Sequence, residues 1–319
     1  MTYLVTGGTG FIGSYVCRDL VHLGERVVAY DLLPSRDILG KILTKKQESE
    51  LTIEQGDISD FDGLGRVVQK HKVDRIIHLA SMLHPASNEN PVLAEKVNTL
   101  GTANVFECAR LLGVIKIVWA SSMVVFGPPY MYPQEYLPND APHAPPHVYG
   151  ATKSHCEFLA NHYRKTWEID HIGLRFTIVY GPGRVRGATA FIQKLMIEPA
   201  LGRSVTLPYG DGEIDWQFVE DIAALTVKCS QIGKTRTSIF NTKFDVRSIR
   251  EAASYVKSII PDADITLLPG TLGLSCKLDD SLLQSEIGFT PQYPMERGIL
   301  ETMNFVRRQA GLPPLEEKA

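Results

Sequence analysis

The stretch TYLVTGGTGFIGS, residues 2–14, decides how the rest of the chain is interpreted. Its first five residues are β-branched, aromatic or aliphatic, a composition typical of a short buried strand. Glycines follow at once and predict a tight turn, after which the apolar periodicity predicts a helix over residues 11–23. The chain therefore begins with a strand, a glycine-rich turn and a helix, the first unit of an alternating β/α arrangement.

The glycines of this turn have a spacing that suits a bound phosphate. Gly8, Gly10 and Gly13 satisfy the pattern GxGxxG, and the set that begins at Gly7 satisfies GxxGxxG. Glycine is required where the turn is tight, where a pyrophosphate approaches the backbone and where the helix packs closely on the strand. The free N–H groups and the positive end of the helix dipole then attract the phosphate. The predicted contacts with a dinucleotide are Gly7, Gly10, Phe11, Ile12 and Gly13.

Two acidic residues extend this prediction to the rest of the nucleotide. Asp31 ends the second predicted strand, where a carboxylate can accept both ribose hydroxyls of NAD and would repel the 2′-phosphate of NADP. Asp57 and Ile58 follow the third strand, where the carboxylate could meet the adenine amine or could instead cap the next helix. The sequence therefore predicts NAD as the cofactor and leaves two roles open for Asp57.

The alternation of short apolar runs and helical patterns continues through the first half of the chain. Strands are expected at residues 2–6, 25–30, 51–54, 74–79, 115–120, 171–179 and 238–241, and long helices near 92–112 and 149–166. Helices between parallel strands must cover both faces of the sheet, which predicts a doubly wound α/β fold. A segment with seven prolines, residues 128–146, interrupts the pattern and is expected to be an ordered loop or lid.

The pattern changes to mixed short elements after Gly181, which suggests a second domain. We expect an NAD-binding domain at residues 1–180, joined by a returning strand near residues 236–245. A smaller, mainly substrate-binding α/β domain is expected at residues 181–319.

Composition narrows the class of protein. Of 319 residues, 44% are hydrophobic and 22% are charged, which is typical of a globular chain with a sizeable core. The formal net charge of −3 gives no reason to expect nucleic acid or a membrane surface as a partner. The five cysteines form no CxxC pair, no apolar stretch is long enough to cross a bilayer, and the early first strand leaves no room for a leader segment. We therefore expect a cytoplasmic enzyme with reduced thiols and a small-molecule substrate.

A second group of residues predicts the chemistry. Ser122 follows the fifth predicted strand, and Tyr149 and Lys153 have a YxxxK spacing that puts them on one face at the start of a helix. A lysine one turn from a phenol, near a nicotinamide cation, lowers the phenol pKa from its usual value of about 10. Tyr149 then becomes a general acid or base near neutral pH.

These motifs make the chain similar to the extended short-chain dehydrogenase/reductases, also called the NAD-dependent epimerase/dehydratase family. The resemblance runs through the segments TGGTGFIGS (6–14), HLA (78–80), VNTLGTANVFECAR (97–110), SSMVVFG (121–127), YGATKSHCE (149–157), LRFTIVYGPG (174–183) and EIGFTP (286–291). The resemblance covers nearly the whole chain and implies a seven-stranded Rossmann domain with a small C-terminal substrate domain.

The resemblance also implies roles for individual residues. Tyr149 would be the catalytic acid/base, Lys153 would bind the nicotinamide ribose and tune Tyr149, and Ser122 would hydrogen-bond the reacting oxygen. Asn98 would support a proton relay, and Tyr180 would back the nicotinamide. Two further cofactor contacts are expected at Leu79 and Ala80.

Assembly is a further implication of the resemblance. In this family the helices that correspond to residues 92–112 and 149–166 pair across a two-fold axis, and Phe158 and Leu159 offer part of a self-complementary apolar patch. We therefore expect a homodimer.

Four departures from the family pattern bear on the substrate. Sugar 4,6-dehydratases carry an Asp-Glu pair where this chain has Met123 and Val124, so we expect no such elimination. Nucleotide-sugar epimerases hold the diphosphate with an Asn at the position of Ile178 and with an Arg before a strand that matches residues 214–221 here, and neither is present. A lysine that often follows the HLA-type segment is also missing. These absences argue against a UDP-sugar substrate.

Other side chains are candidates for substrate contacts. His84 follows the fourth strand, where loops at the carboxyl ends form the ligand crevice, although a loop-packing histidine is the alternative. Arg184 and Arg186 follow Gly-Pro-Gly and could bind a carboxylate or phosphate, or could simply be solvated. Ser122 completes the predicted substrate contacts. The histidines show no metal-ligand spacing, and we predict no metal.

Three functions remain open. The leading hypothesis is an NAD-dependent dehydrogenase that transfers hydride at a secondary alcohol or ketone carbon of a small polar substrate other than a nucleotide sugar. The alternative is a sugar or nucleotide-sugar epimerase that oxidises, rotates and re-reduces its substrate while retaining NAD. The third is a redox-silent NAD-sensing module, against which the Ser122, Tyr149 and Lys153 set argues.

Overall fold

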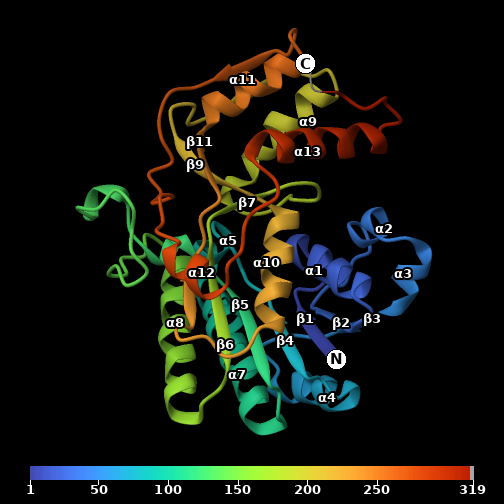
Figure 1. Ribbon diagram of the computed structural model, residues 1–319, viewed down its shortest axis with the longest axis vertical. Helices are drawn as coiled ribbons and strands as arrows, with labels where there is room; N and C mark the ends of the chain where they lie inside the picture. Colours follow the sequence, from blue (N-terminus) through green and yellow to red (C-terminus); the bar gives the residue numbers. More distant parts are fainter. Residues whose placement is uncertain (317–319) are drawn as a thin grey trace.

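The main sheet of the protein has seven parallel strands, in the order β10-β6-β5-β4-β1-β2-β3 (Figure 1). The computed structural model describes residues 1–316. In chain order the strands are β1 (Thr2–Thr6), β2 (Arg26–Asp31), β3 (Leu51–Gln55), β4 (Arg75–His78), β5 (Lys116–Ser122), β6 (His171–Phe176) and β10 (Ile239–Asn241).

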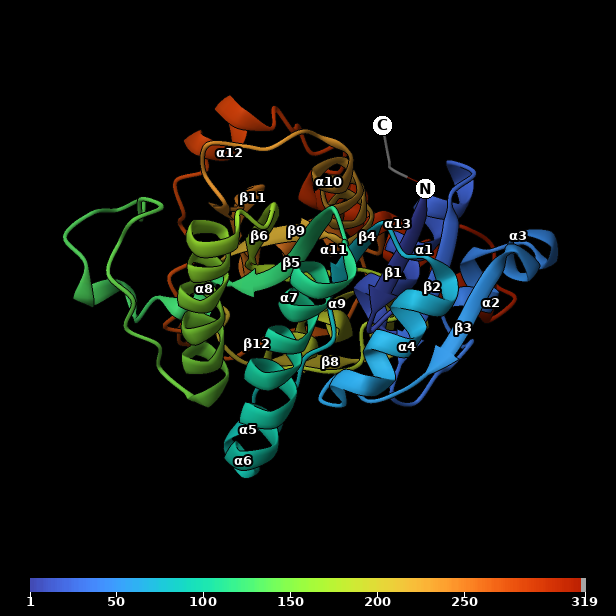
Figure 2. The ribbon, with the colours of Figure 1, turned by 90° about the horizontal axis from the view of Figure 1, so that it is seen from below.

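Helices cover both faces of this sheet (Figure 2). One face packs against α1 (Phe11–His22) and α10 (Val219–Gln231), and the other against α4 (Phe61–His71), α7 (Gly101–Leu112) and α8 (Val148–Trp167). Successive strand residues alternate between the two cores, and strands buried on both sides are mostly apolar. The predicted doubly wound fold is therefore confirmed.

A smaller α/β region lies over the carboxyl end of the main sheet (Figure 1). Its sheets have the orders β11-β9-β7 and β12-β8. The strands are β7 (Ile178–Tyr180), β8 (Val205–Leu207), β9 (Glu213–Phe218), β11 (Asp245–Ser248) and β12 (Ile265–Leu267). Its helices are α9 (Lys194–Ala200), α11 (Ile249–Ile259) and α13 (Met295–Gln309). These elements share a second hydrophobic core, as the expected smaller domain requires.

The single strand predicted over residues 171–179 is wrong, because the chain changes sheets at Thr177. β6 pairs with β5 in the main sheet, whereas β7 pairs with β9 in the smaller region. The Thr177 backbone N–H donates to Gln217 Oε1 at 3.1 Å, and its hydroxyl donates to Asp215 Oδ2 at 2.8 Å. Side chains of β9 therefore accept the hydrogen bonds from both the N–H and the hydroxyl of Thr177. Because the residues on either side of Thr177 are apolar, the sequence pattern does not reveal the change of sheet.

The two cores also interleave along the chain more than a boundary at residue 180 suggests. Residues 123–126, which follow β5, belong to the second core. Conversely, α10 and β10 return to the main sheet, and α12 (Ser281–Glu286) packs on the same side as α10. Each core therefore draws on chain from both sides of residue 180.

The connecting segments contain short helices. Before β4 these are α2 (Leu39–Ile42) and α3 (Lys45–Glu50), and after it α5 (Ala86–Glu89) and α6 (Pro91–Ala94). The helix predicted over residues 92–112 is continuous but includes a π-helical turn, η1 (Glu95–Leu100), between α6 and α7. The proline-rich segment 128–146 projects from the body (Figures 1 and 2), and Leu137 anchors it in the second core.

Among the described residues, no helix combines the length and the apolar character that a bilayer crossing requires. The five cysteines are all buried and free.

A buried ion pair joins the elements that carry the predicted catalytic residues. Arg175 on β6 donates from Nε and Nη2 to the two carboxylate oxygens of Glu157 on α8, at 2.8 and 2.7 Å. The Ser121 hydroxyl on β5 donates to the same carboxylate at 2.5 Å. Arg175 also donates to the carbonyl of Asn139 in the proline-rich segment at 2.7 Å. One pair therefore fixes β5, α8, β6 and the projecting segment to one another.

We expect Glu157→Gln to destabilise the protein by about 3–5 kcal/mol at neutral pH, because Arg175 would then be buried without a counter-charge. Burial alone would raise the pKa of Glu157, but hydrogen bonds from Arg175, His143 and Ser121 outweigh it and lower the pKa to about 2. The pair therefore stabilises the fold fully above the ordinary glutamate pKa of about 4.3, and this contribution is lost as pH falls toward 2. Denaturant unfolding from pH 7 to pH 3 measures both effects.

The exposed pair Glu198–Arg203, 3.6 Å apart, supplies the control. Glu198→Gln should cost about 1 kcal/mol or less. Equal losses of stability for the two substitutions would contradict the structural role of the buried pair. So would a Glu157→Gln protein whose stability falls between pH 7 and pH 3 as steeply as that of the wild type.

Candidate active site

The predicted cofactor and catalytic residues gather at the carboxyl edge of the main sheet. The glycine-rich turn follows β1, Asp31 ends β2, Leu79 and Ala80 follow β4, and Ser122 ends β5. β1 and β4 are neighbours whose following connections leave to opposite sides, so the edge between them is the topological switch point of the sheet. Ligands of doubly wound folds bind in the crevice at that point.

The glycines of the turn serve two different purposes. A Cβ on Gly13 would lie 2.1 Å from the Gly7 carbonyl oxygen, and a Cβ on Gly8 would lie 2.6 Å from that of Val5. Gly10, in contrast, is exposed, and a Cβ there would meet only the Gly7 carbonyl group, whose oxygen would lie at 3.1 Å. Gly8 and Gly13 are therefore required by packing, whereas Gly10 leaves its outer side open to a ligand.

The N-terminus of α1 faces this open side. Gly10 is the N-cap residue, no side chain caps the helix, and no acidic residue lies in its first turn. Phe11 and Ile12 begin the helix, so their main-chain N–H groups are available to a phosphate, as predicted.

Asp31 is held in place by the turn itself. The Thr9 hydroxyl donates to Asp31 Oδ2 at 2.8 Å, and the Thr9 backbone N–H donates to the same oxygen at 3.2 Å. Oδ1 accepts only a longer contact from the Leu33 N–H, at 3.4 Å. The Asp31 carboxylate is therefore oriented beside the glycine-rich turn, and its Oδ1 is largely available to a ribose.

Asp57 does not cap the next helix. Its Oδ1 accepts from the Ser59 N–H and hydroxyl at 2.8 and 2.7 Å, while Asp60 caps α4 by accepting from the Gly63 N–H at 3.1 Å. The alternative role considered for Asp57 is therefore wrong. The Ile58 side chain is buried in the core and leaves only its main chain for a cofactor contact.

Tyr149 and Ser122 come together because α8 begins close to the end of β5. A Cβ on Gly150 would lie 2.2 Å from the Val124 carbonyl oxygen, so glycine is needed for this approach. The Tyr149 phenol lies near the Ser122 and Ser81 side chains, and both act to lower its pKa. Lys153 lies one turn further along, with Nζ 5.7 Å from the centre of the Tyr149 ring. The predicted catalytic set is thus assembled.

The side chains alone do not lower the pKa of Tyr149. Burial raises the pKa of Tyr149 to about 12, and the nearby Ser122 and Ser81 side chains oppose this only in part. Burial also lowers the pKa of Lys153, whose Nζ donates to the Ala120 carbonyl at 2.7 Å. The sequence also predicts a lowered pKa from the positive charge of a nicotinamide ring. That charge would act on Tyr149 only with a cofactor bound.

Asn98 lies in the π-helical turn and clamps the loop after β4. Its Oδ1 accepts from the Met82 N–H at 2.7 Å and the Ser81 hydroxyl at 3.1 Å. Its Nδ2 donates to the Met82 carbonyl and the Thr152 hydroxyl, both at 3.0 Å. The amide therefore has its hydrogen bonds filled by protein and positions Ser81 and α8, so a proton relay would have to use other atoms.

His84 lies next to this group. Its ring stacks on that of His147 with centres 4.4 Å apart, and the His147 ring lies 6.1 Å from that of Tyr149. His147 also caps α8 by accepting from the Gly150 N–H at 3.2 Å. His84 Nδ1 is buried without a hydrogen-bond partner in the described part of the chain.

The two predicted arginines differ in their surroundings. The Arg184 guanidinium donates to the Val179 carbonyl and, at 2.5 Å, to the Thr189 hydroxyl. Arg186 is exposed and has no hydrogen bond or ion pair with any residue of the described chain. Arg184 is thus partly buried and held by its own segment, whereas Arg186 is exposed.

Comparisons with known proteins agree with this geometry. The family model described as GDP-mannose 4,6 dehydratase matches residues 4–262. A UDP-glucose 4-epimerase from Mycolicibacterium smegmatis is 30% identical over 97% of this chain and 100% of its own. This chain belongs to the NAD-dependent epimerase/dehydratase family. The family predicted from the motifs is therefore confirmed, and with it that the protein is an enzyme.

Solved structures show the same fold. The UDP-glucose 4-epimerase of Thermus thermophilus, in complex with NAD, has a TM-score of 0.82 and 26% identity over 96% of this chain and 99% of its own. A GalE-like L-threonine dehydrogenase from Cupriavidus necator has a TM-score of 0.84 at 21% identity, with 95% of this chain and 99% of its own covered. Enzymes with different activities thus share this fold.

One predicted cofactor contact of the family is not available in this structure. The Tyr180 side chain is fully buried in the second core, packs edge-on against Trp216 and donates to the Met295 carbonyl at 3.2 Å. The prediction that Tyr180 backs the nicotinamide is therefore wrong for its side chain, because the switch of sheets at Thr177 turns this strand into the smaller region.

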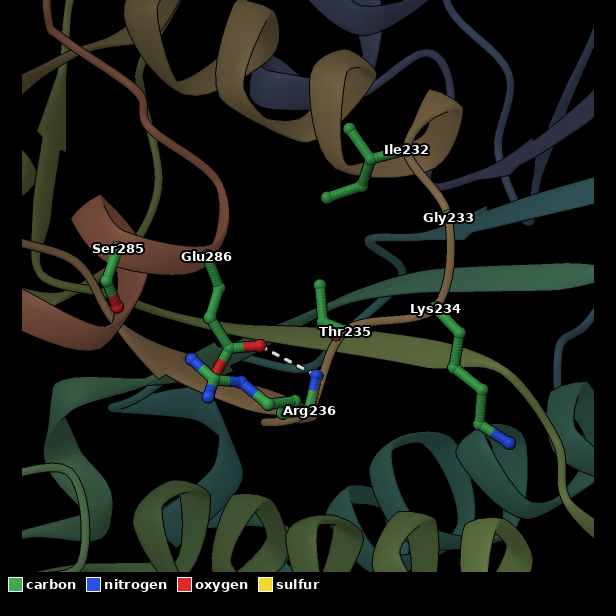
Figure 3. A pocket seen from close by; sticks show the side chains of 7 residues that line it. All are labelled: Ile232, Gly233, Lys234, Thr235, Arg236, Ser285 and Glu286. Carbon is green, nitrogen blue, oxygen red and sulfur yellow. Dashed lines mark hydrogen bonds between the residues drawn. The ribbon is translucent and has the colours of Figure 1, made fainter.

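A surface hollow elsewhere on the protein is not part of the site. It is lined by residues of the segment before β10 and of α12 (Figure 3), among them Lys234, Arg236 and Glu286. Segments that precede parallel strands lie at the amino edge of the sheet, opposite the glycine turn. The Glu286 carboxylate there already accepts from the Arg236 N–H at 2.7 Å.

The described residues contain no group of three or more His, Cys, Asp or Glu side chains placed to hold a metal ion.

The position of Asp31 gives a prediction about cofactor choice. We expect tighter binding of NAD than of NADP by a few kcal/mol, because the carboxylate repels the 2′-phosphate and would lose a ribose hydrogen bond. Asp31→Asn should reduce this preference, as measured by fluorescence titration with both cofactors. Asp37→Asn, an equal charge change at an exposed position, is the control. Equal affinity of the wild type for NADP would contradict the assignment, since Arg36, the nearest cation in sequence, is already paired with Glu48 at 2.7 Å.

Proposed function

We propose that this chain is an NAD-dependent epimerase that inverts a secondary alcohol carbon of a sugar or nucleotide sugar by oxidation and re-reduction. The observation that carries the proposal is the grouping of Tyr149, Ser122 and Lys153 at the sheet edge that also bears the glycine turn, with Lys153 Nζ 5.7 Å from the centre of the Tyr149 ring. The 30% identity with a UDP-glucose 4-epimerase over nearly the whole chain supports an epimerase over a net dehydrogenase.

The residues of the chain divide the chemistry as follows. NAD, when bound, supplies a hydride acceptor at C4 of its nicotinamide ring. Tyr149 takes the proton of the substrate hydroxyl, and the Ser122 hydroxyl orients the reacting oxygen. Lys153 binds the nicotinamide ribose, and its charge favours the ionised phenol. Inversion requires the ketone to rotate in the site and present its opposite face. The hydride and the proton then return to the same carbon and oxygen.

The glycine turn and Asp31 are proposed to hold NAD. The open face of Gly10, the uncapped N-terminus of α1 and the oriented Asp31 carboxylate support this. Leu79 and Ala80 lie beside the turn, because a Cβ on Gly7 would be 2.9 Å from the Ala80 nitrogen. They are proposed to border the cofactor.

A net dehydrogenase remains the second candidate, and one observation favours it. Ile178 and Ile214 stand where nucleotide-sugar epimerases carry diphosphate contacts, and both side chains are buried in the second core. The fold shared with an L-threonine dehydrogenase is compatible with a smaller substrate. Met123 and Val124 are buried and carry no transferable proton, so neither candidate includes elimination.

The decisive experiment follows NADH and product together. One sample of the purified protein is denatured to release any retained NAD. A second sample is incubated with sugars, nucleotide sugars, hydroxy acids and L-threonine. We expect formation of an epimer by NMR without net NADH absorbance. NADH formed in step with product would establish the dehydrogenase instead. Tight NAD binding without turnover of any compound would support the NAD-sensing module and overturn both enzymatic proposals.

The same assay tests the role of Tyr149. Tyr149→Phe should retain cofactor binding and lose about 10²–10⁴-fold in turnover, because the phenol oxygen is removed while the ring still packs. Tyr163→Phe is the matched control, since this phenol lies on the same helix but donates to Glu107 at 2.5 Å, away from the site. Near-normal turnover by Tyr149→Phe would exclude the mechanism.

We further propose that the chain forms a homodimer through the outer side of α7 and α8. Phe158 on α8 is 75% exposed and Leu111 on α7 is 51% exposed, which supports an apolar contact with a second copy. Leu159, in contrast, packs partly on its own core. Light scattering should give twice the chain mass, and Phe158→Glu should give the mass of one chain. A monomeric wild type at micromolar concentration would contradict the proposal.

A further inference from the structure

The first turn of α8, which carries Tyr149, is closed by a histidine side chain. His147 is the N-cap residue of the helix, and its ring Nδ1 accepts a hydrogen bond from the Gly150 N–H at 3.2 Å. Gly150 is buried against the Val124 carbonyl, where no Cβ would fit. Within residues 1–316 the bond to His147 is the only one that the Gly150 N–H makes, so removal of the ring would leave a buried donor unpaired.

This cap works only while the imidazole is neutral. In a neutral ring one nitrogen accepts and the other carries a proton, so Nδ1 accepts from Gly150 only when the proton is on Nε2. A protonated ring has a proton on both nitrogens and would face the Gly150 N–H with a second donor. The N-terminal end of the helix also repels a positive charge. The usual N-cap residues, serine, threonine, asparagine and aspartate, keep their acceptor throughout the neutral range.

His84 adds a second constraint on the same ring. The two imidazoles are stacked, with their centres 4.4 Å apart and their planes 2° from parallel. Two positive charges at this distance repel each other, so the pair does not readily hold both. Nδ1 of His84 is buried without a hydrogen-bond partner in the described chain, so a proton there would have no acceptor. Burial and the His84 ring lower the pKa of His147, and an interaction with its own main chain opposes this only in part.

The surroundings of the two rings supply no counter-charge. The titratable and charged groups on the adjoining elements are Glu89 of α5, Glu95 and Lys96 of η1, His143 of the proline-rich segment, Arg184 after β7, and Tyr149 and Lys153 of α8 itself. The residues of α6 and of the turn 123–125 are uncharged. Within the described chain, the histidines that pair with a carboxylate are His71 and His143. No acid therefore stabilises a protonated His147.

We propose that His147 is a positioning residue for Tyr149: its neutral ring holds the first turn of α8 in place, and protonation of the ring releases that turn. The inference rests on the proposed function, because it takes Tyr149 as the acid/base. Tyr149 and Gly150 are consecutive, so the bond to Gly150 fixes the main chain that carries the phenol. This contribution is complete above the ordinary histidine pKa of about 6.5 and is lost as pH falls through the lowered pKa of His147.

Three substitutions of His147 separate capping from stacking. His147→Ala removes both, His147→Phe keeps a ring against His84 but has no acceptor, and His147→Asn supplies an N-cap that does not titrate. At pH 8 we expect the Ala and Phe variants to lose about fivefold or more in kcat, the factor that an N-cap is worth. His147→Asn should restore kcat to within about threefold of the wild type. Wild-type turnover by His147→Phe, or no rescue by His147→Asn, would overturn the inference.

The pH profile gives a readout that a merely structural role would not change. Between pH 8 and pH 5, log kcat of the wild type should fall with pH more steeply than that of His147→Asn, by about one proton, because only the wild type must keep the ring neutral. His155→Asn is the matched control, since this histidine lies exposed on the same helix, and it should keep the wild-type slope. Equal slopes for the wild type and His147→Asn would refute the role of His147.

Hydrogen exchange tests the cap without turnover. After correction for the intrinsic effect of pH on exchange, the Gly150 amide should lose protection in the wild type below about pH 6.5 and in His147→Ala at every pH. In His147→Asn it should stay protected throughout. Protection of Gly150 that does not depend on residue 147 would contradict the cap, whatever the kinetics show.

The two proposals fail separately. NADH formed in step with product would refute the epimerase, and the slope and rescue measured on that reaction would still decide the role of His147. Epimerisation with equal slopes in the wild type and His147→Asn would uphold the proposed function and overturn this inference. Absence of turnover with every compound would remove the acid/base role of Tyr149 and would overturn both.

Discussion

The salt bridge between Glu157 and Arg175 is the constraint on which the geometry of the catalytic side depends. Both side chains are almost completely buried, and such a pair is tolerated only when its remaining hydrogen-bonding groups are filled. Ser121 fills one position on the carboxylate, and Asn241 Oδ1 accepts from Arg175 Nη1 at 2.9 Å. Satisfying one buried pair therefore dictates where β5, α8, β6 and β10 end relative to one another.

This arrangement also positions the residues proposed for catalysis. Ser122 follows Ser121 directly, so the hydrogen bond that completes the Glu157 carboxylate also fixes the end of β5 beneath Tyr149. Lys153 lies one turn before Glu157 on the same helix, and its Nζ reaches the carbonyl of Ala120 on β5. The ion pair touches none of the reacting atoms, yet it holds the two elements between which those atoms must fit.

A neutral histidine connects the cofactor side to the catalytic side. Burial lowers the pKa of His78 to about 3, so the ring carries one proton. The Thr102 hydroxyl donates to the Asn98 carbonyl at 2.6 Å and must therefore accept from His78 Nε2, 3.0 Å away. Nδ1 is then left to accept from the Thr6 hydroxyl at 2.7 Å. The tautomer is thus set by its neighbours, and a directional chain runs from β1 beside the glycine turn to the clamp at Asn98.

The sequence predicts the cofactor side better than the substrate side, for a physical reason. The glycine turn, Asp31 and the YxxxK helix are short local patterns, and the structure assembles them as predicted. Thr9, Ser81 and His147 have no such signal, because their roles depend on neighbours distant in the chain. The π-helical turn around Asn98 is equally hidden, since its apolar spacing is that of an ordinary helix. The burial of the Tyr180 side chain could not be predicted from the sequence either. The change of sheet at Thr177 depends on Asp215 and Gln217, some forty residues later.

Ile178 and Arg184 lie close together in the chain but differ in their surroundings. Ile178 is buried in the second core opposite Trp216, where a polar side chain would be desolvated without a partner. Arg184, six residues later, is partly exposed and forms no ion pair with an Asp or Glu of residues 1–316. Apolar packing thus occupies the position of Ile178, whereas the segment that follows β7 carries a cation. The second core is built from both halves of the chain, so the packing around Ile178 is set separately from the Glu157–Arg175 pair that holds β5, α8 and β6 together.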